Sequence, residues 1–193
     1  MNSSIFNYVD LRGLDHVRQG TSEAILSSYD KLYRYGLSRV WDPTLNTMVW
    51  VMLNPSTADA SLDDQTIRKC CGFARLHGCG SIVVVNLFAY RSTDPKQLTK
   101  VQDPAGPANL LMLTTTLDAA RQRGWRVVAG WGRLPSRSIG ALADLSVRRV
   151  AQATGVRCFG VTRDGSPRHP CMLGYATPLV SYVPILPPSL LAG

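Results

Sequence analysis

Two asparagines and one histidine are the residues of this chain whose types and positions suggest chemistry. Asn54 and Asn86 each follow an apolar run, and His169 lies in the polar loop Gly-Ser-Pro-Arg-His-Pro. A carboxamide offers a hydrogen-bond donor and an acceptor in one plane, and an imidazole donates or accepts near neutral pH. Together they can read the edge of a nucleobase, orient a water molecule and stabilise developing negative charge.

The strands that would position these side chains are short apolar runs. Residues 34–41 and 46–53 are β-prone and are joined by Asp-Pro-Thr-Leu, which predicts a hairpin leading into the first core strand. Further strands are predicted at 81–86, 126–131 and 156–161. Their nearly continuous apolar content is typical of parallel strands covered on both faces.

Helical patterns alternate with these strands. They cover residues 63–77, 106–123 and 138–153, with Asp63 or Asp64 as the expected cap of the first. The alternation predicts a three-layer α/β/α sandwich with a central, mostly parallel four-stranded sheet plus the N-terminal hairpin. Asp64 is also a candidate for positioning a water molecule or Asn54.

The length and the patterning favour one domain over residues 1–193, with a tail at 164–193 read as an ordered loop followed by a packed strand or coil. In such a sheet, ligands bind where the carboxyl ends of the strands meet. Asn54, Asn86, the Trp-Gly pair at 131–132 and the Thr-Arg pair at 162–163 follow four strand ends, so polar groups should converge there.

The composition and the cysteine spacing indicate the compartment in which the protein is expected to act and whether it binds a metal. No apolar run reaches the roughly 18–20 residues of a membrane span, and the N-terminus lacks the layout of a signal peptide, so we expect a cytoplasmic monomer without membrane contact. The five cysteines form no Cys-x-x-Cys pair. They are expected to be reduced and mostly buried, and no metal or cofactor is predicted.

The charge points to a polyanionic partner. The formal net charge is +8, and 17 of the 21 basic residues are arginine. Because the planar guanidinium matches phosphate oxygens in pairs, an arginine-rich surface favours nucleic acid over simple solvation. An ordinary basic enzyme remains the alternative interpretation.

Four short motifs, in order, resemble the uracil-DNA glycosylase superfamily, through a family of bacterial and phage proteins of unknown function. They are Met-Leu-Asn-Pro-Ser at 52–56, Val-Val-Val-Asn-Leu-Phe at 83–88, Val-Val-Ala-Gly-Trp-Gly at 127–132, and His169-Pro170 with an apolar residue, Leu173, four places after the histidine. The first is similar to the version found in mismatch-specific glycosylases. The resemblance implies a DNA glycosylase with the fold described above.

The resemblance also implies roles for individual residues. Asn54 would orient the attacking water through its amide oxygen, and His169 would bond a base oxygen as negative charge accumulates. Asn86 would read the edge of a pyrimidine turned out of the helix, with Phe88 as a stacking surface or merely a core residue. Ser56 would form the wall beside the 5-position of the base.

DNA binding requires a wedge and phosphate contacts. Either Leu173 or Met172 is expected to fill the gap left by the base. Hydroxyl and guanidinium donors for the flanking phosphates are expected from Thr57, Arg91, Ser92, Arg133, Ser166 and Arg168.

The chain departs from the uracil-specific pattern, which has Asp in place of Asn54 and Tyr in place of Ser56. The smaller wall favours a mismatched thymine or an enlarged, modified pyrimidine, and hence a role in defence against phage with modified DNA. Two alternatives stay open. One is a hydrolase or transferase of free nucleosides or nucleotides, and the other is a non-catalytic DNA-binding protein.

Overall fold

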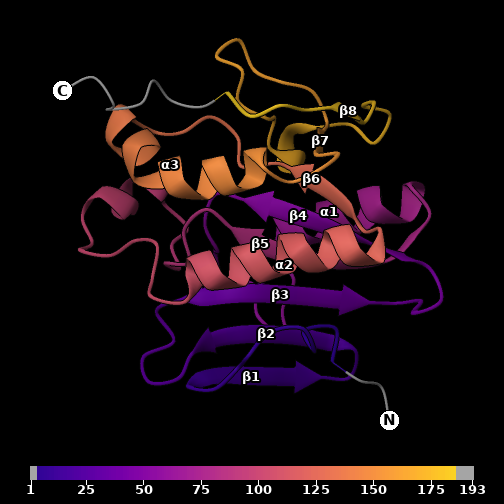
Figure 1. Cartoon of the computed structure of the whole chain (residues 1–193), viewed down its shortest axis with the longest axis horizontal. Helices are drawn as coiled ribbons and strands as arrows, with labels where there is room; N and C mark the ends of the chain where they lie inside the picture. Colours follow the sequence, from indigo (N-terminus) through magenta and orange to yellow (C-terminus); the bar gives the residue numbers. More distant parts are fainter. Residues whose placement is uncertain (1–3, 186–193) are drawn as a thin grey trace.

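The computed structural model describes residues 4–185, and the end of the predicted tail, residues 186–193, lies outside the described residues. The strands form one eight-stranded sheet in the order β1-β2-β3-β5-β4-β6-β7-β8 (Figure 1). Their bounds are β1 Leu14–Gln19, β2 Ser22–Ser27, β3 Arg34–Val40, β4 Asn46–Met52, β5 Cys79–Asn86, β6 Arg126–Ala129, β7 Arg157–Cys158 and β8 Val180–Ser181.

The sheet is mixed. Strands β5, β4, β6 and β7 pair in parallel, whereas β1, β2, β3 and β5 pair antiparallel, as do β7 and β8. The prediction of an α/β fold is confirmed, but the prediction of a four-stranded, mostly parallel sheet is wrong. The parallel strands are flanked on both sides by antiparallel ones that have more polar sequences and weaker apolar patterns.

The predicted hairpin between residues 34–41 and 46–53 is also wrong. These runs form β3 and β4, but β5 lies between them and pairs with both. An apolar, β-prone run shows that a strand is present, and the turn after it does not determine which strand becomes its neighbour. The antiparallel arrangement at this edge comes instead from β1, β2 and β3.

Three α-helices cover the sheet, at Gln65–Leu76 (α1), Asn109–Arg123 (α2) and Arg137–Ala151 (α3), and two 3-10 turns lie at Pro95–Thr99 (η1) and Pro170–Met172 (η2). All three predicted helices are present. Asp64 caps α1, because its Oδ1 accepts the Ile67 amide at 2.9 Å. Gly124 ends α2 in the left-handed conformation with φ of 65°.

The helices lie on opposite faces of the sheet. Side chains of α2 and α3 pack with Val49, Val51, Val83 and Val85, and we call this cluster the α2/α3-side core. Side chains of α1 pack with Met48, Trp50, Ile82 and Val84, which we call the α1-side core. Alternate residues of β4 and β5 therefore enter opposite cores, as the two-residue period of a strand requires (Figure 1).

Four of the five cysteines are buried, Cys171 is half-buried, and all five are free thiols, as predicted. Among residues 4–185, no helix has the length and apolar character needed to cross a bilayer.

Candidate functional site

Asn86 is the most unusual residue at the carboxyl edge of the parallel strands. It is the last residue of β5, its exposed fraction is 1%, and neither Nδ2 nor Oδ1 of its side chain has a hydrogen-bond partner among residues 4–185. Since Ile82 and Val84 enter the α1-side core, the strand period places Asn86 on that face. A buried carboxamide without partners costs about 1–3 kcal/mol, so its retention requires an explanation.

The backbone around Asn86 is fixed by a residue that sequence reasoning missed. Asn109, the first residue of α2, is buried and donates its Nδ2 to the carbonyl oxygens of Asn86 at 3.1 Å and Leu87 at 2.9 Å. The Ser146 hydroxyl also donates to Leu87 O, at 3.2 Å. The end of β5 is thus held from the opposite face of the sheet, while the Asn86 side chain is left unbonded.

Asn54 lies at the same edge, just beyond Asn86 along the strand direction. Met52 pairs with Asn86 in the parallel register of β4 and β5, and Asn54 follows two residues later. Its Nδ2 donates to Ser92 O at 2.8 Å and to Pro55 O at 3.1 Å. Because these partners are carbonyl oxygens, the side-chain nitrogen is used in hydrogen bonds within the protein. The side-chain amide oxygen remains as the acceptor for a ligand or water.

His169 reaches this edge from the loop after β7. Its Cβ lies against Gly132, after β6: a Cβ added to Gly132 would be 3.3 Å from it. Gly132 also donates its backbone N–H to Pro167 O at 3.0 Å, and Arg168 donates its own to Gly160 O at 2.9 Å. The loop is therefore pinned beside the ends of β6 and β7.

The protonation of His169 follows from its surroundings. Burial lowers the pKa of the imidazole, and the charge of Asp64 opposes this only in part. The Cys171 amide donates to Nδ1 at 3.4 Å, so a neutral ring carries its proton on Nε2. The residue is thereby prepared to act as a neutral donor through Nε2.

Arg34 is a second residue that the sequence does not single out, because an arginine is expected to lie at the surface. It begins β3, is 2% exposed, and donates Nη1 to the carbonyl of Ala58, a member of the α1-side core. Its Nε is buried and has no hydrogen-bond partner in the part of the chain that the structure describes. Burial lowers the pKa of the guanidinium to about 10, with Asp64 the strongest opposing charge, so Arg34 remains a cation at neutral pH.

The carboxylate of Asp64 influences both Arg34 and His169 through its charge. Neither forms an ion pair with it within 4 Å in the described part of the chain. The carboxyl edge of the parallel strands thus carries the two carboxamides and the His169 loop, and the charge of Asp64, at the start of α1, acts on both His169 and Arg34.

The remaining residues predicted for base recognition differ in exposure. Ser56 is half-buried in the loop after β4, and the next residue, Thr57, which is predicted to contact a phosphate, is exposed. Phe88, in contrast, is fully buried in the α2/α3-side core, on the opposite face from Asn86. Its ring therefore offers no open stacking surface to a base at this site.

The residues predicted to contact DNA lie around the same edge. Arg91 and Ser92 are half-buried, with Arg91 Nη1 donating to Lys31 O at 3.3 Å and the Ser92 hydroxyl donating to Asp94 O at 2.9 Å. Arg133 is exposed and pairs with Asp164 at 3.1 Å, Ser166 is half-buried, and Arg168 is exposed.

The two wedge candidates have opposite exposures. Met172 is 83% exposed, whereas Leu173 is 4% exposed and belongs to the α1-side core. In this conformation Met172 is the candidate that can enter a DNA duplex.

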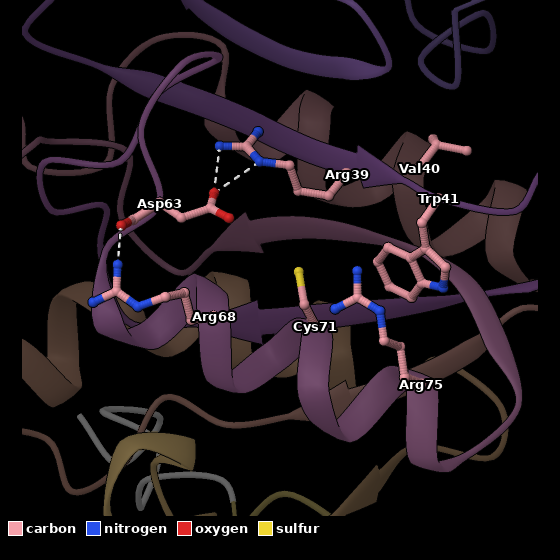
Figure 2. Close-up of a pocket in the computed structure, with 7 residues that line it drawn as sticks. All are labelled: Arg39, Val40, Trp41, Asp63, Arg68, Cys71 and Arg75. Carbon is pink, nitrogen blue, oxygen red and sulfur yellow. Dashed lines mark hydrogen bonds and ion pairs between the residues drawn. The ribbon is translucent and has the colours of Figure 1, made fainter.

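A groove lies on the same face of the protein but beyond this edge. It has a volume of about 280 Å³ and runs between the end of β3 and α1, with arginines at both ends (Figure 2). None of the residues predicted from the sequence as site residues lines it.

Comparison with known proteins gives a family but no function. The family described as "Protein of unknown function (DUF1643)" matches residues 34–171, most of the chain. The chain belongs to this family. The matched segment extends from Arg34 to Cys171 and so includes Asn54, Asn86 and His169. No curated protein and no solved structure matches the chain.

Proposed function

We propose that this DUF1643 protein is a monofunctional DNA glycosylase that hydrolyses the N-glycosidic bond of a pyrimidine turned out of the helix. The observation that carries the proposal is the buried Asn86 side chain, both of whose polar atoms lack partners. A carboxamide that is costly to the folded protein is accounted for when a ligand supplies the missing donor and acceptor. The Watson–Crick edge of a pyrimidine supplies both.

The neighbouring groups suit the two charges that develop as the bond breaks. The departing base becomes negative, and the neutral His169 can donate Nε2–H to a base oxygen, while Arg34, whose Nε has no partner in the described part of the chain, provides a buried positive charge. The sugar becomes positive and is attacked by water. The amide oxygen of Asn54, whose nitrogen is held by Ser92 O, can orient that water.

The surroundings of the site support a polymeric DNA substrate. Met172 projects into solvent three residues after His169 and can occupy the gap left in the duplex. Arg168, which directly precedes His169, is exposed and can bind a phosphate. The proposed place of action is the cytoplasm, where five free thiols stay reduced, and the protein acts as a monomer.

The substrate is proposed to be a mismatched thymine or a modified base with a 5-substituent. Ser56, at the wall of the site, has a small, half-buried side chain that leaves room beside the 5-position. A role in defence against phage with modified DNA follows from this preference.

The proposal is tested by incubating the protein with duplexes that carry uracil, mismatched thymine or a 5-modified cytosine, and then cleaving abasic sites with alkali. Strand breaks that depend on Asn54, and disappear in Asn54→Ala, are the expected result. Absence of abasic sites with every base, including modified phage genomic DNA, would contradict it.

The burial of Leu173 favours a second candidate, a hydrolase of free nucleosides or nucleotides, because such an enzyme needs no wedge. Release of the base from a free nucleoside or nucleotide, with no reaction on DNA, is the outcome that would favour it.

A further inference from the structure

The groove between β3 and α1 has a basic lining. Arg39 from β3 and Arg68 and Arg75 from α1 surround it, and Asp63 is its one acidic residue (Figure 2). The floor adds no negative charge, because burial raises the pKa of the Cys71 thiol to about 11 and keeps it neutral. The groove therefore carries a surplus of positive charge at neutral pH.

Each guanidinium in the groove is held in place by the protein. Arg39 pairs with Asp63 at 2.7 Å, and Nη1 of Arg68 donates to the backbone carbonyl of Asp63 at 2.5 Å. The guanidinium of Arg75 lies over the Trp41 ring, 4.2 Å from its centroid.

The aromatic ring under Arg75 is fixed in turn. The Trp41 indole N–H donates to Cys79 O at 3.1 Å. A guanidinium stacked on a ring keeps its edge N–H groups available, so little side-chain entropy remains to be lost when an anion binds.

The helical spacing fits more than one phosphate. Arg68 and Arg75 are seven residues apart on one face of α1, which corresponds to a rise of about 10 Å. Neither forms an ion pair with a carboxylate among residues 4–185. Because the protein holds Arg68 at Asp63 O and Arg75 over the Trp41 ring, successive phosphates of a nucleic-acid strand can contact the two guanidinium groups separately.

The groove also adjoins the candidate site. Asp63 forms one end of the groove, and the next residue, Asp64, is the carboxylate whose charge acts on Arg34 and His169. Because α1 begins at this point, a strand leaving the site can follow the helix from Arg68 to Arg75.

We propose that this groove is a binding track for the sugar-phosphate backbone of the DNA strand, in which Arg68 and Arg75 contact different phosphates. The proposal rests on the proposed function, since it takes DNA as the substrate, and adds a surface outside the site where the base would be cleaved.

The test measures the affinity of the full chain for a fluorescently labelled DNA duplex by anisotropy over a range of salt concentrations. Each phosphate contact contributes about 0.9 to the slope of log affinity against log salt concentration. Arg68→Gln and Arg75→Gln should each lower the magnitude of the slope by about 0.9, and the double variant by about 1.8. Arg121→Gln, an exposed arginine on α2 across the sheet, is the matched control and should leave the slope unchanged.

The outcomes separate this proposal from the proposed function. Unchanged slopes in both groove variants, or an equal loss in Arg121→Gln, would overturn the track and leave the glycosylase proposal standing. Reduced slopes in a protein that forms no abasic sites would support the track and contradict the glycosylase. A wild-type chain that binds no DNA at all would overturn both.

Discussion

The side-chain amide of Asn109 donates to the backbone carbonyl of Asn86 at 3.1 Å, across the sheet from the face that the Asn86 side chain occupies. The Asn109 side chain thus holds the backbone of Asn86, from which the Asn86 side chain projects to the other face. Among the described residues, the Asn109 side chain lacks a partner only at Oδ1, whereas the Asn86 side chain lacks one at both polar atoms.

Asn109→Asp should destabilise the protein by about 1–3 kcal/mol, because a carboxylate would face two buried carbonyl oxygens that now accept hydrogen bonds. Chemical denaturation measures the change. Ser146→Ala is the control: it removes only the 3.2 Å bond to Leu87 O, which keeps its bond from Asn109, and should cost less. Equal losses would show that Asn109 has no special role.

The apolar pattern of the sequence identified the central strands and the helices, but it did not predict which strands are neighbours in the sheet. Continuous apolar runs at β4, β5 and β6 and capped amphipathic patterns at α1 and α3 carry strong local signals, and Gly124 marks the end of α2. Strands β1 and β2 mix polar and apolar residues, and the position of β5 between β3 and β4 depends on contacts distant in sequence. The predicted strand at 156–161 is short in the structure, where β7 covers only Arg157–Cys158.

The same distinction holds for the site. A polar residue at the end of an apolar strand identified Asn54 and Asn86, since the carboxyl ends of parallel strands share an edge. Arg34 and Asn109 gave no such signal: an arginine is expected to be exposed, and an asparagine in the first turn of a helix is ordinary. Their burial depends on the tertiary packing of β3 and α2.

Acidification should destabilise the protein partly through His169. Burial lowers the pKa of this imidazole in the folded state, so below about pH 6.5 the unfolded chain binds a proton that the folded chain does not. The free energy of unfolding should therefore fall as the pH falls through this range. His169→Gln should show a smaller fall between pH 7.5 and 5.5, and the remainder should include His77, whose pKa is also lowered. An identical pH dependence in the variant would contradict the assignment.

Arg34→Met should separate a ligand-binding arginine from a structural one. Methionine removes a buried cation with an unpartnered Nε and fills similar space, so the free energy of unfolding should change by no more than about 1 kcal/mol. The single-turnover rate of base excision should fall by about 10²-fold or more.

The control for Arg34 is Arg39→Met on the same strand. Arg39 is paired with Asp63 and donates to nearby backbone carbonyls, so its replacement should lower the free energy of unfolding by about 1–2 kcal/mol, more than for Arg34→Met. The excision rate at saturating enzyme should fall less than in Arg34→Met. If the two variants lose stability and rate in the same proportions, Arg34 is merely holding the loop at Ala58.

Met172→Ala should reduce excision from duplex DNA while excision from a single strand is preserved, because only the duplex leaves a gap to be filled. Since Met172 is exposed, stability should change by less than about 0.5 kcal/mol. Leu173→Ala should instead lower the free energy of unfolding by about 2–5 kcal/mol, as expected for a buried leucine. If Leu173→Ala loses excision from duplex DNA while its stability is unchanged, the wedge is Leu173.

The most direct test of the central claim is to measure stability and base excision together in Asn86→Leu. Leucine has a similar size and removes two buried polar atoms that lack partners. The free energy of unfolding should rise by about 1–3 kcal/mol while alkali-sensitive sites in substrate DNA disappear. A variant that is less stable than the wild type, or that still excises the base, would show that the Asn86 carboxamide serves the fold and is not kept for a ligand.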